Sequence, residues 1–262
     1  MDLTVPQIKQ QLQKAGPEEF EALERSLVAD TRKGVRSAIE VARKRIAAEI
    51  EEQKRLEGLY SYEAALAKDR SCSVILGLDE VGRGPIAGPL AIGAVVLPRD
   101  VLIAGLNDSK QVKPEARERI AEQIKKEALA WNVQYIQPRE IDAVGMTACL
   151  VVAFRRAIEA VEAMGIIPDI VLLDGNPLRL DSREVNVIKG DAKCASIAAA
   201  SIIAKVERDA LMDAYAQSYP EYGFESNKGY ASADHIDAVK RCGLSPIHRV
   251  SFCGSFMQET LF

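Results

Sequence analysis

Four acidic side chains stand at positions where a sheet-containing protein could use them for chemistry. Asp79 and Glu80 end a short apolar run, Asp174 ends another, and Asp191 precedes a long helical stretch. In open α/β sheets, sites form outside the ends of the strands. Clustered carboxylates repel one another unless cations neutralise them, and hard ions such as Mg²⁺ and Mn²⁺ prefer oxygen ligands. Together these acids predict a divalent-ion site of the kind that supports phosphodiester cleavage.

Single acids in this set also have purely structural explanations. Asp191 could cap the helix that follows it, because aspartate is common at helix N-caps. Asp174 precedes Gly175-Asn176-Pro177, which is a typical turn sequence. Both explanations stay open at this point, and the case for a site rests on the four acids occurring together.

The adjacent pair Asp79 and Glu80 presents a geometric difficulty. Neighbouring residues on a strand point to opposite faces, so both cannot face one site while the strand stays regular. Gly82 and Gly84 follow closely, and glycines often mark bulges or bends in strands. We therefore expect the strand to end or to bulge between the two acids.

Composition sets the general class of the protein. A chain of 262 residues with 48% hydrophobic and 27% charged residues is ordinary for one core with a small appendage. It has no apolar run long enough for a membrane span and its first residues do not resemble a signal peptide, so we expect a cytoplasmic protein. The five cysteines form no CxxC pair, which argues against a zinc site or a disulfide framework. The net charge of -4 does not by itself indicate nucleic-acid binding.

Residues 1–70 differ in composition from the rest and predict a helical N-terminal extension. They are rich in Glu, Lys, Arg, Gln and Ala, and their apolar residues recur mostly at helical spacing. A basic stretch within them is either a solvated helix face or a nucleic-acid contact, and both interpretations stay open. Its members are Arg32, Lys33, Arg36, Arg43, Lys44 and Arg45.

Residues 71–262 predict one catalytic domain that ends in a helical part. Three strand-like segments with short links come first, followed by alternating helices and strands, which is the order of a mixed five-stranded α/β sheet flanked by helices. The expected strands are 73–78, 90–97, 132–137, 170–173 and 185–188. The expected helices are 114–130, 146–164, 194–215 and 233–242.

The glycine-rich segment between the first two strands carries a family resemblance. It lacks the spacing of a dinucleotide-binding loop, and a strand follows it instead of a helix. Gly77-Leu-Asp-Glu-Val-Gly-Arg-Gly-Pro85 resembles the DE-x-GRGP block of ribonuclease HII. Further blocks of that family follow in order over about residues 71–255: Asn107–Lys110, Leu173–Gly175, Lys189–Lys193, Ser201–Asp209, Asn227–Tyr230 with His235, and His248–Phe252.

The resemblance implies a ribonuclease H-like fold and a particular activity. Members of this family hydrolyse the RNA strand of RNA–DNA hybrids, leave 5′-phosphate products, and cut 5′ of single ribonucleotides embedded in duplex DNA. It also implies two Mn²⁺ or Mg²⁺ ions, with Asp79, Glu80, Asp174 and Asp191 as the catalytic metal ligands. Ribonucleotide excision repair is the cellular role that follows from it, with the enzyme acting as a monomer.

The resemblance assigns substrate contacts as well. The backbone of Gly82, Arg83 and Gly84 is expected to read the ribose 2′-hydroxyl, which is the group that separates RNA from DNA. Tyr230 matches a tyrosine that stacks on the neighbouring deoxyribose, although a buried aromatic residue is the structural alternative.

Four further side chains have less definite assignments. Lys110 and Lys193 are candidate phosphate contacts, with solvated lysines as the competing interpretation. His235 and His248 are expected to be structural, because two lone histidines do not make a metal site.

Three other functions compete with this assignment. Ribonuclease HIII, a hybrid nuclease without junction specificity, has glutamate as its fourth acid and a β-rich leader, whereas this chain has Asp191 and a helical leader. A non-catalytic nucleic-acid-binding module on the same fold is expected to lack one of the acids. A two-metal resolvase acting on DNA junctions would have no evident use for the glycine loop or Tyr230.

Overall fold

The computed structural model describes residues 3–68, 74–99, 101–180 and 182–257. Its contacts divide the chain into two units, Met1–Glu57 and Gly58–Phe262. The last turns of helix α3 (Lys33–Lys68) therefore belong to the second unit. The boundary predicted between residues 70 and 71 lies outside the described residues. The assignment of 71–262 as the catalytic domain stays a prediction.

The first unit consists of α1 (Val5–Lys14), α2 (Pro17–Ser26) and the beginning of α3. Their apolar positions recur every three or four residues, so each helix presents one apolar face and the three faces share a small core. Ile8, Phe20 and Val35 are buried in it. The predicted helical N-terminal extension is therefore confirmed.

Most of the basic stretch in this unit is engaged within the extension. Arg43 lies 2.5 Å from the Glu24 carboxylate. Arg45 lies 2.7 Å from that of Glu49. Arg36 donates to the carbonyl oxygen of Asp30 at 2.8 Å, and Lys33 and Lys44 are exposed. These contacts favour the interpretation of the stretch as a solvated helix face.

The second unit is built on a five-stranded sheet in the order β3-β2-β1-β4-β5. β1 pairs antiparallel with β2, β2 pairs antiparallel with β3, and β4 and β5 continue parallel to β1. The mixed sheet flanked by helices confirms the predicted fold class. Its strands are β1 (Ile75–Val81), β2 (Leu90–Val96), β3 (Ala130–Ile136), β4 (Ile170–Asp174) and β5 (Glu184–Val187).

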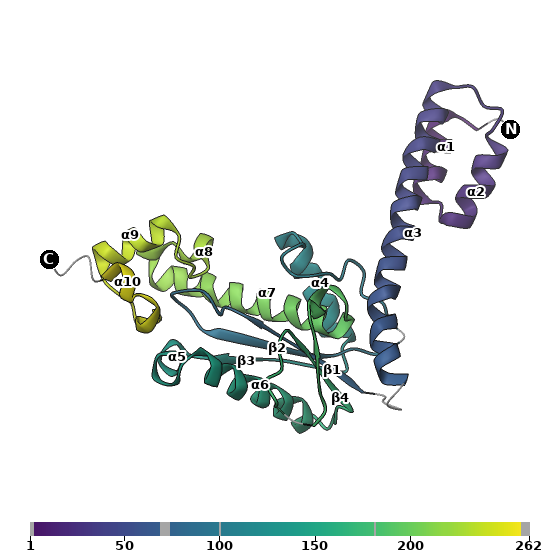
Figure 1. Ribbon diagram of the computed structural model, residues 1–262. Coiled ribbons are helices and arrows are strands. Elements are labelled where there is room, and N and C mark those ends of the chain that lie inside the picture. Colours follow the sequence, from purple (N-terminus) through teal and green to yellow (C-terminus); the bar gives the residue numbers. More distant parts are fainter. Residues whose placement is uncertain (1–2, 69–73, 100, 181, 258–262) are drawn as a thin grey trace. The chain divides into compact units, whose positions relative to one another are not determined.

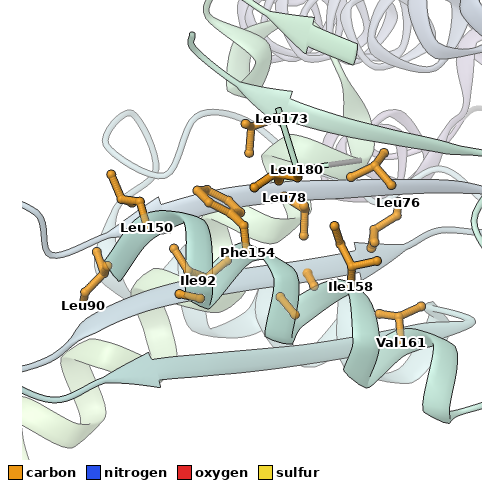
Figure 2. Close-up of a cluster of buried hydrophobic side chains, with 14 of the residues drawn as sticks. Leu76, Leu78, Leu90, Ile92, Leu150, Phe154, Ile158, Val161, Leu173 and Leu180 are labelled. Carbon is orange, nitrogen blue, oxygen red and sulfur yellow. The ribbon is translucent and has the colours of Figure 1, made fainter. Parts of the chain in front are cut away.

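Helices α6 (Met146–Ala163) and α7 (Ala195–Ser218) cover opposite faces of this sheet (Figure 1). Side chains alternate along a strand, so Leu76 and Leu78 of β1 point toward α6. There they pack with Leu150, Phe154 and Ile158 in the cluster of Figure 2.

The face of β1 that carries Gly77 meets α7 instead. A Cβ atom at Gly77 would lie 2.2 Å from the carbonyl carbon of Ser196, so only glycine permits this approach. A Cβ atom at Gly93 on β2 would lie 2.2 Å from the carbonyl oxygen of Ala200. The alanines and serines of α7 therefore pack directly against the backbone of the sheet.

The remaining helices lie around the sheet and beyond its edge. Of these, α4 and α9 were predicted, whereas the short α5 was not. No helix among the described residues combines the length and apolar character needed to cross a bilayer. The remaining helices are α4 (Pro114–Glu127), α5 (Pro138–Val144), η1 (Gly190–Ala192), η2 (Pro220–Tyr222), α8 (Phe224–Asn227), α9 (Ala233–Cys242), η3 (Val250–Phe252) and α10 (Gly254–Met257).

A buried glutamate joins the end of α3 to the start of α7. The carboxylate of Glu63 accepts hydrogen bonds from the backbone N–H and the hydroxyl of Ser196, both at 2.6 Å. These bonds satisfy a free N–H group in the first turn of α7. Burial raises the pKa of Glu63 to about 7, and the two bonds from Ser196 oppose this rise.

Because its pKa is raised in the folded state, Glu63 stabilises the fold below its usual pKa of 4.5 and loses that contribution as the pH rises through about 7. Glu63→Gln keeps an acceptor for Ser196 and removes the buried charge. Its free energy of unfolding, relative to the unsubstituted chain, should rise by on the order of 3 kcal/mol between about pH 5 and about pH 8. Urea unfolding across this range measures the difference, with Glu118→Gln on the exposed face of α4 as control. Parallel curves for Glu63→Gln and the unsubstituted chain would contradict the prediction.

Candidate functional site

Strand β1 carries Asp79 and Glu80 past the point where we predicted it to break. Pairing with β2 continues in unbroken register, with Asp79 opposite Gly93 and Glu80 opposite Ile92. The expected end or bulge between the two acids is therefore wrong. The chain leaves the strand only after Val81, at Gly82, where φ is +91°. Backbone pairing with β2 thus outweighs the polar character of the two side chains. Because the strand ends directly after Val81, both residues can still line one cleft at that end.

Asp79 lies on the face of β1 that meets α7. It is only 6% exposed, and it accepts a hydrogen bond from the backbone N–H of Glu80 at 2.8 Å. Ser201 on α7 lies beside it, and the Ser201 hydroxyl donates to that of Ser109 at 2.9 Å. Burial raises the pKa of Asp79 well above its usual value, the charges of Glu80 and Asp174 add to the rise, and the nearby Ser201 hydroxyl opposes it.

Glu80 pairs with the arginine of the glycine loop. The Arg83 guanidinium lies 2.9 Å from the Glu80 carboxylate. Burial raises the pKa of Glu80, Arg83 opposes that rise, and the charge of Asp174 adds to it. The side chain of Arg83 thus faces an acid of the candidate site, while its backbone remains available for other contacts.

Asp174 and Asp191 lie near each other on the side of β1 that faces away from β2. Asp174 is the last residue of β4, and its Oδ1 accepts the N–H of Gly190 at 2.7 Å, which ties the strand end to η1. Asp191 lies within η1 and is 8% exposed. Burial raises its pKa, the charges of Asp108 and Asp174 add to the rise, and Lys110, 3.9 Å away, opposes it.

The structural alternatives for these two acids fare differently. Cys194, not Asp191, occupies the N-cap position of α7, so Asp191 does not cap that helix. Asp174 does precede a turn, since Gly175 has φ of +89°. The turn and a role in a site are compatible for Asp174, because its charge raises the pKa of Asp79, Glu80 and Asp191.

A cleft of about 330 Å³ opens at the end of β1 and gathers most of the predicted residues. Asp174, Asp191 and Lys193 are not part of its lining, and Lys193 is exposed beside Asp191. The cleft is lined by Asp79, Glu80, Val81, Gly82, Arg83, Gly84, Ser109, Lys110, Ser201, Lys205 and Tyr230.

The four acids influence one another without forming a ready-made coordination sphere. Within the part of the chain that the structure describes, no three His, Cys, Asp or Glu side chains are grouped so that they could hold one metal ion. Their coupling is seen instead in the pKa shifts, since Asp174 raises the pKa of each of the other three acids. A cation shared among them would require at least one carboxylate to turn.

Tyr230 stands at the mouth of the cleft and is not a buried aromatic residue. Tyr230 is 48% exposed, and a Cβ atom added at Gly84 would lie 3.8 Å from the tyrosine ring. The tyrosine therefore lies beside the glycine loop, on the solvent side of the site.

A chain of two buried histidines holds the backbone of Tyr230. The N–H of Ser245 donates to Nδ1 of His248 at 3.0 Å, which leaves the proton of His248 on Nε2. That group faces Nε2 of His235 at 3.0 Å, and Nδ1 of His235 lies 2.7 Å from the carbonyl oxygen of Tyr230. The order is consistent with two neutral rings, and burial lowers the pKa of both histidines. Their contacts are those of structural residues.

The sequence analysis missed three polar residues of the cleft: Ser109, Ser201 and Lys205. Lys205 lies 2.8 Å from Asp209 on the same helix and also lines the cleft. A signal was present, because Ser201 and Lys205 are four residues apart and so share one face of the predicted helix 194–215. Serine and lysine are common on helices, however, and the pattern alone does not indicate a site.

Comparison with known proteins places the chain among ribonucleases H. It matches the family described as Ribonuclease HII over residues 76–255 and the Ribonuclease HII N-terminal domain over residues 4–67. It is 43% identical over 228 residues to the ribonuclease HII of Listeria monocytogenes, covering 87% of this chain and 86% of that one. It is 44% identical over 232 residues to that of Clostridium acetobutylicum, covering 86% and 89%.

Solved structures show the same fold. The ribonuclease H2 of Pyrococcus horikoshii matches with a TM-score of 0.61 and 28% identity, over 72% of this chain and 99% of that one. The Archaeoglobus fulgidus ribonuclease HII, solved in complex with PCNA, matches with 0.58 and 26%, over 68% and 94%. A Bst ribonuclease HIII solved with Mn²⁺ is 22% identical with a TM-score of 0.61, over 72% and 70%, and shows the fold alone.

The raised pKa of Asp79 means that its ionised carboxylate destabilises the folded chain at neutral and higher pH. Asp79→Asn keeps the shape and the acceptor oxygen without the charge. In buffer with EDTA at about pH 8 its free energy of unfolding should exceed that of the unsubstituted chain, because folding of the variant buries no charge at this position.

Addition of Mn²⁺ should then stabilise the unsubstituted chain more than the variant, because only the former keeps the carboxylate. Thermal or urea unfolding with and without Mn²⁺ measures both effects, with Asp237→Asn on the exposed face of α9 as the matched control. A variant that is less stable than the unsubstituted chain in EDTA contradicts this account of Asp79.

Proposed function

Because this chain belongs to the ribonuclease HII family, we propose that it cuts RNA–DNA hybrids and also the 5′ side of single ribonucleotides embedded in duplex DNA. The family makes it a ribonuclease H, a nuclease of the hydrolase class. One observation supports the finer proposal: the loop 82–84 and Tyr230 line the same cleft as the buried acid Asp79. The loop that contacts the ribose and the tyrosine that contacts the next sugar would thus lie beside the acids that support cleavage.

The donor set fits divalent ions such as Mn²⁺ or Mg²⁺. Four carboxylates lie at the ends of β1 and β4 and in η1, and all donors are hard oxygen atoms. The charge of Asp174 raises the pKa of the other three acids and that of Glu80 raises the pKa of Asp79, so a nearby cation would relieve an existing repulsion. Asp79, Glu80, Asp174 and Asp191 are the proposed ligands. Two bound ions would supply activation of the attacking water and stabilisation of the leaving oxygen.

Protein groups around the acids have defined tasks in this proposal. The N–H of Glu80 fixes the orientation of the Asp79 carboxylate, and the Ser201 hydroxyl lies beside it. Lys110 and Lys205 bring positive charge to the cleft, where they would bind the phosphates that flank the cut. Lys193 remains a proposed phosphate contact from the exposed surface beside Asp191.

Junction recognition is assigned to the glycine loop and the tyrosine together. Arg83 and Gly84 are exposed at the cleft, so their backbone can approach a ribose closely. The Tyr230 ring beside Gly84 would pack on the next sugar, where an added 2′-hydroxyl would fit poorly. The step from RNA to DNA would then be the feature that both elements read.

Ribonuclease HIII is the alternative for this fold. It is not favoured, because the family match is to ribonuclease HII and its N-terminal domain, and because the fourth acid is Asp191. We propose that this chain acts as a monomer. We place this activity in the cytoplasm, on ribonucleotides left in DNA that await excision repair.

Tyr230→Ala should cleave a duplex with one embedded ribonucleotide about 10- to 100-fold more slowly than the unsubstituted chain. This loss corresponds to roughly 1–3 kcal/mol of lost stacking. The loss on a continuous RNA–DNA hybrid should be smaller, because no deoxyribose follows the cut there. Gel mapping of the products measures both rates and shows whether the unsubstituted chain cuts 5′ of the ribonucleotide.

Tyr230→Phe is the matched control, since it keeps the ring and should retain most of the activity. Equal loss on both substrates for Tyr230→Ala would make Tyr230 a packing residue and would favour an enzyme without junction specificity.

A further inference from the structure

Two fully buried arginines lie beneath the cleft without an acidic partner. Arg208 and Arg249 are both 0% exposed. Among the described residues neither forms an ion pair, and their guanidinium groups donate to main-chain carbonyl oxygens instead. A buried charge without a counter-ion is unfavourable unless its hydrogen bonds are well made. The carbonyl groups that each arginine binds therefore define its role.

Arg249 binds the glycine loop itself. Its guanidinium donates to the carbonyl oxygens of Gly82 at 2.7 Å and Arg83 at 3.0 Å, and to that of Gly88 at 2.8 Å and 3.0 Å. The ring of Phe252 covers the guanidinium, with 5.3 Å from its carbon to the ring centroid. The backbone N–H of Arg249 also donates to Ile86 at 2.8 Å. The loop is thus held from the protein side at several successive residues.

The direction of these carbonyl groups fixes the direction of the next amides. The described peptide bonds are trans, so the N–H of a peptide unit points away from its C=O. With the carbonyls of Gly82 and Arg83 turned toward Arg249, the N–H groups of Arg83 and Gly84 point outward. Both residues are exposed, and within the described chain neither N–H donates to a backbone carbonyl. Two successive free amides form a donor pair for an oxygen atom.

We propose that Arg249 is a positioning residue for ribonucleotide recognition: it locks the loop so that the N–H groups of Arg83 and Gly84 donate to the ribose 2′-oxygen. The inference rests on the proposed function and adds to it the residue that holds loop 82–84 in its conformation. At Arg83 and Gly84 the loop would donate hydrogen bonds to the ribose and not accept them.

Lysine cannot replace arginine in this arrangement. The planar fork of a guanidinium reaches three carbonyl groups at once, whereas an ammonium group is a single point of charge. Burial, with a smaller contribution from the nearby Arg208, lowers the pKa of Arg249 to about 10, so the group stays protonated at neutral pH. Arg249→Lys therefore keeps the charge and removes the fork.

Arg208 provides a matched control. It is equally buried and also donates to three carbonyls, those of Pro89 at 2.9 Å, Lys228 at 3.0 Å and Ala87 at 3.2 Å. None of these belongs to residues 82–84. The Arg208 side chain packs beneath Gly82 without bonding to residues 82–84. Arg208→Lys should therefore lower stability as Arg249→Lys does, while the carbonyls of Gly82 and Arg83 stay bound to Arg249.

The first experiment measures binding by the full-length chain to two duplexes of one sequence, one with a single ribonucleotide and one all-deoxy, in buffer with EDTA. Arg249→Lys should lose about tenfold of the preference for the ribonucleotide, through the loss of hydrogen bonds, with all-deoxy affinity unchanged. Arg208→Lys should keep the preference. An unchanged preference in a folded Arg249→Lys variant overturns the proposal.

The second experiment uses the unsubstituted chain and so does not depend on a variant that folds. Amide hydrogen exchange by NMR should show Arg83 and Gly84 exchanging fast in the free protein. The duplex with a ribonucleotide should slow both, and the all-deoxy duplex should not. The N–H of Gly88, bonded to Ile247 at 2.8 Å, should be slow in every sample.

Two results would overturn the proposal here: protection of the Arg83 and Gly84 amides in the free protein, or equal protection by both duplexes, which would indicate a phosphate contact. The proposed function fails on a different result, namely no cleavage of either the hybrid or the ribonucleotide duplex by the unsubstituted chain. The outcomes for Arg249 and for the activity are therefore separate.

Discussion

The close approach of α7 to the sheet is the constraint on which the rest of the second unit depends. It is possible because Gly77 and Gly93 have no Cβ where the backbone of the helix passes. Helix α7 then brings its polar side chains to fixed places along β1: Ser196 at one end, Ser201 beside Asp79, and Arg208 under the glycine loop. A larger residue at either glycine would move the helix away from the sheet and would displace all three contacts together.

Three buried ionisable groups in this unit bond to dipoles and form no ion pair among the described residues. Glu63 and Asp79 are held by hydroxyl and backbone N–H groups, and Arg249 by carbonyl groups. The consequences differ in sign. The acids keep raised pKa values and favour a neighbouring cation, whereas the arginine remains charged and instead fixes the loop that it binds. In the proposed function, the first property serves metal binding and the second serves ribose recognition.

Hydrophobic patterning was enough to predict the five strands, the main helices and the helical extension, because the core is built from faces with regular period. The end of β1 was predicted wrongly, since Asp79 and Glu80 are polar and nothing in the local sequence shows that β2 continues to pair with them. Residues that reach the acids or the glycine loop across the fold, such as Ser201 and Arg249, could not be assigned, because their partners lie far away in the chain. The acids themselves were found because charge at a strand end is conspicuous in the sequence.

Asp174 allows the most direct test of the account, because its charge is felt by Asp79, Glu80 and Asp191 alike. The decisive measurement is the rate at which Asp174→Asn cleaves the RNA strand of an RNA–DNA hybrid while Mn²⁺ or Mg²⁺ is raised to saturation. The account predicts a folded variant whose saturated rate is lower by about 100-fold or more, equivalent to about 3 kcal/mol of barrier. A rate close to that of the unsubstituted chain at saturating metal would contradict it.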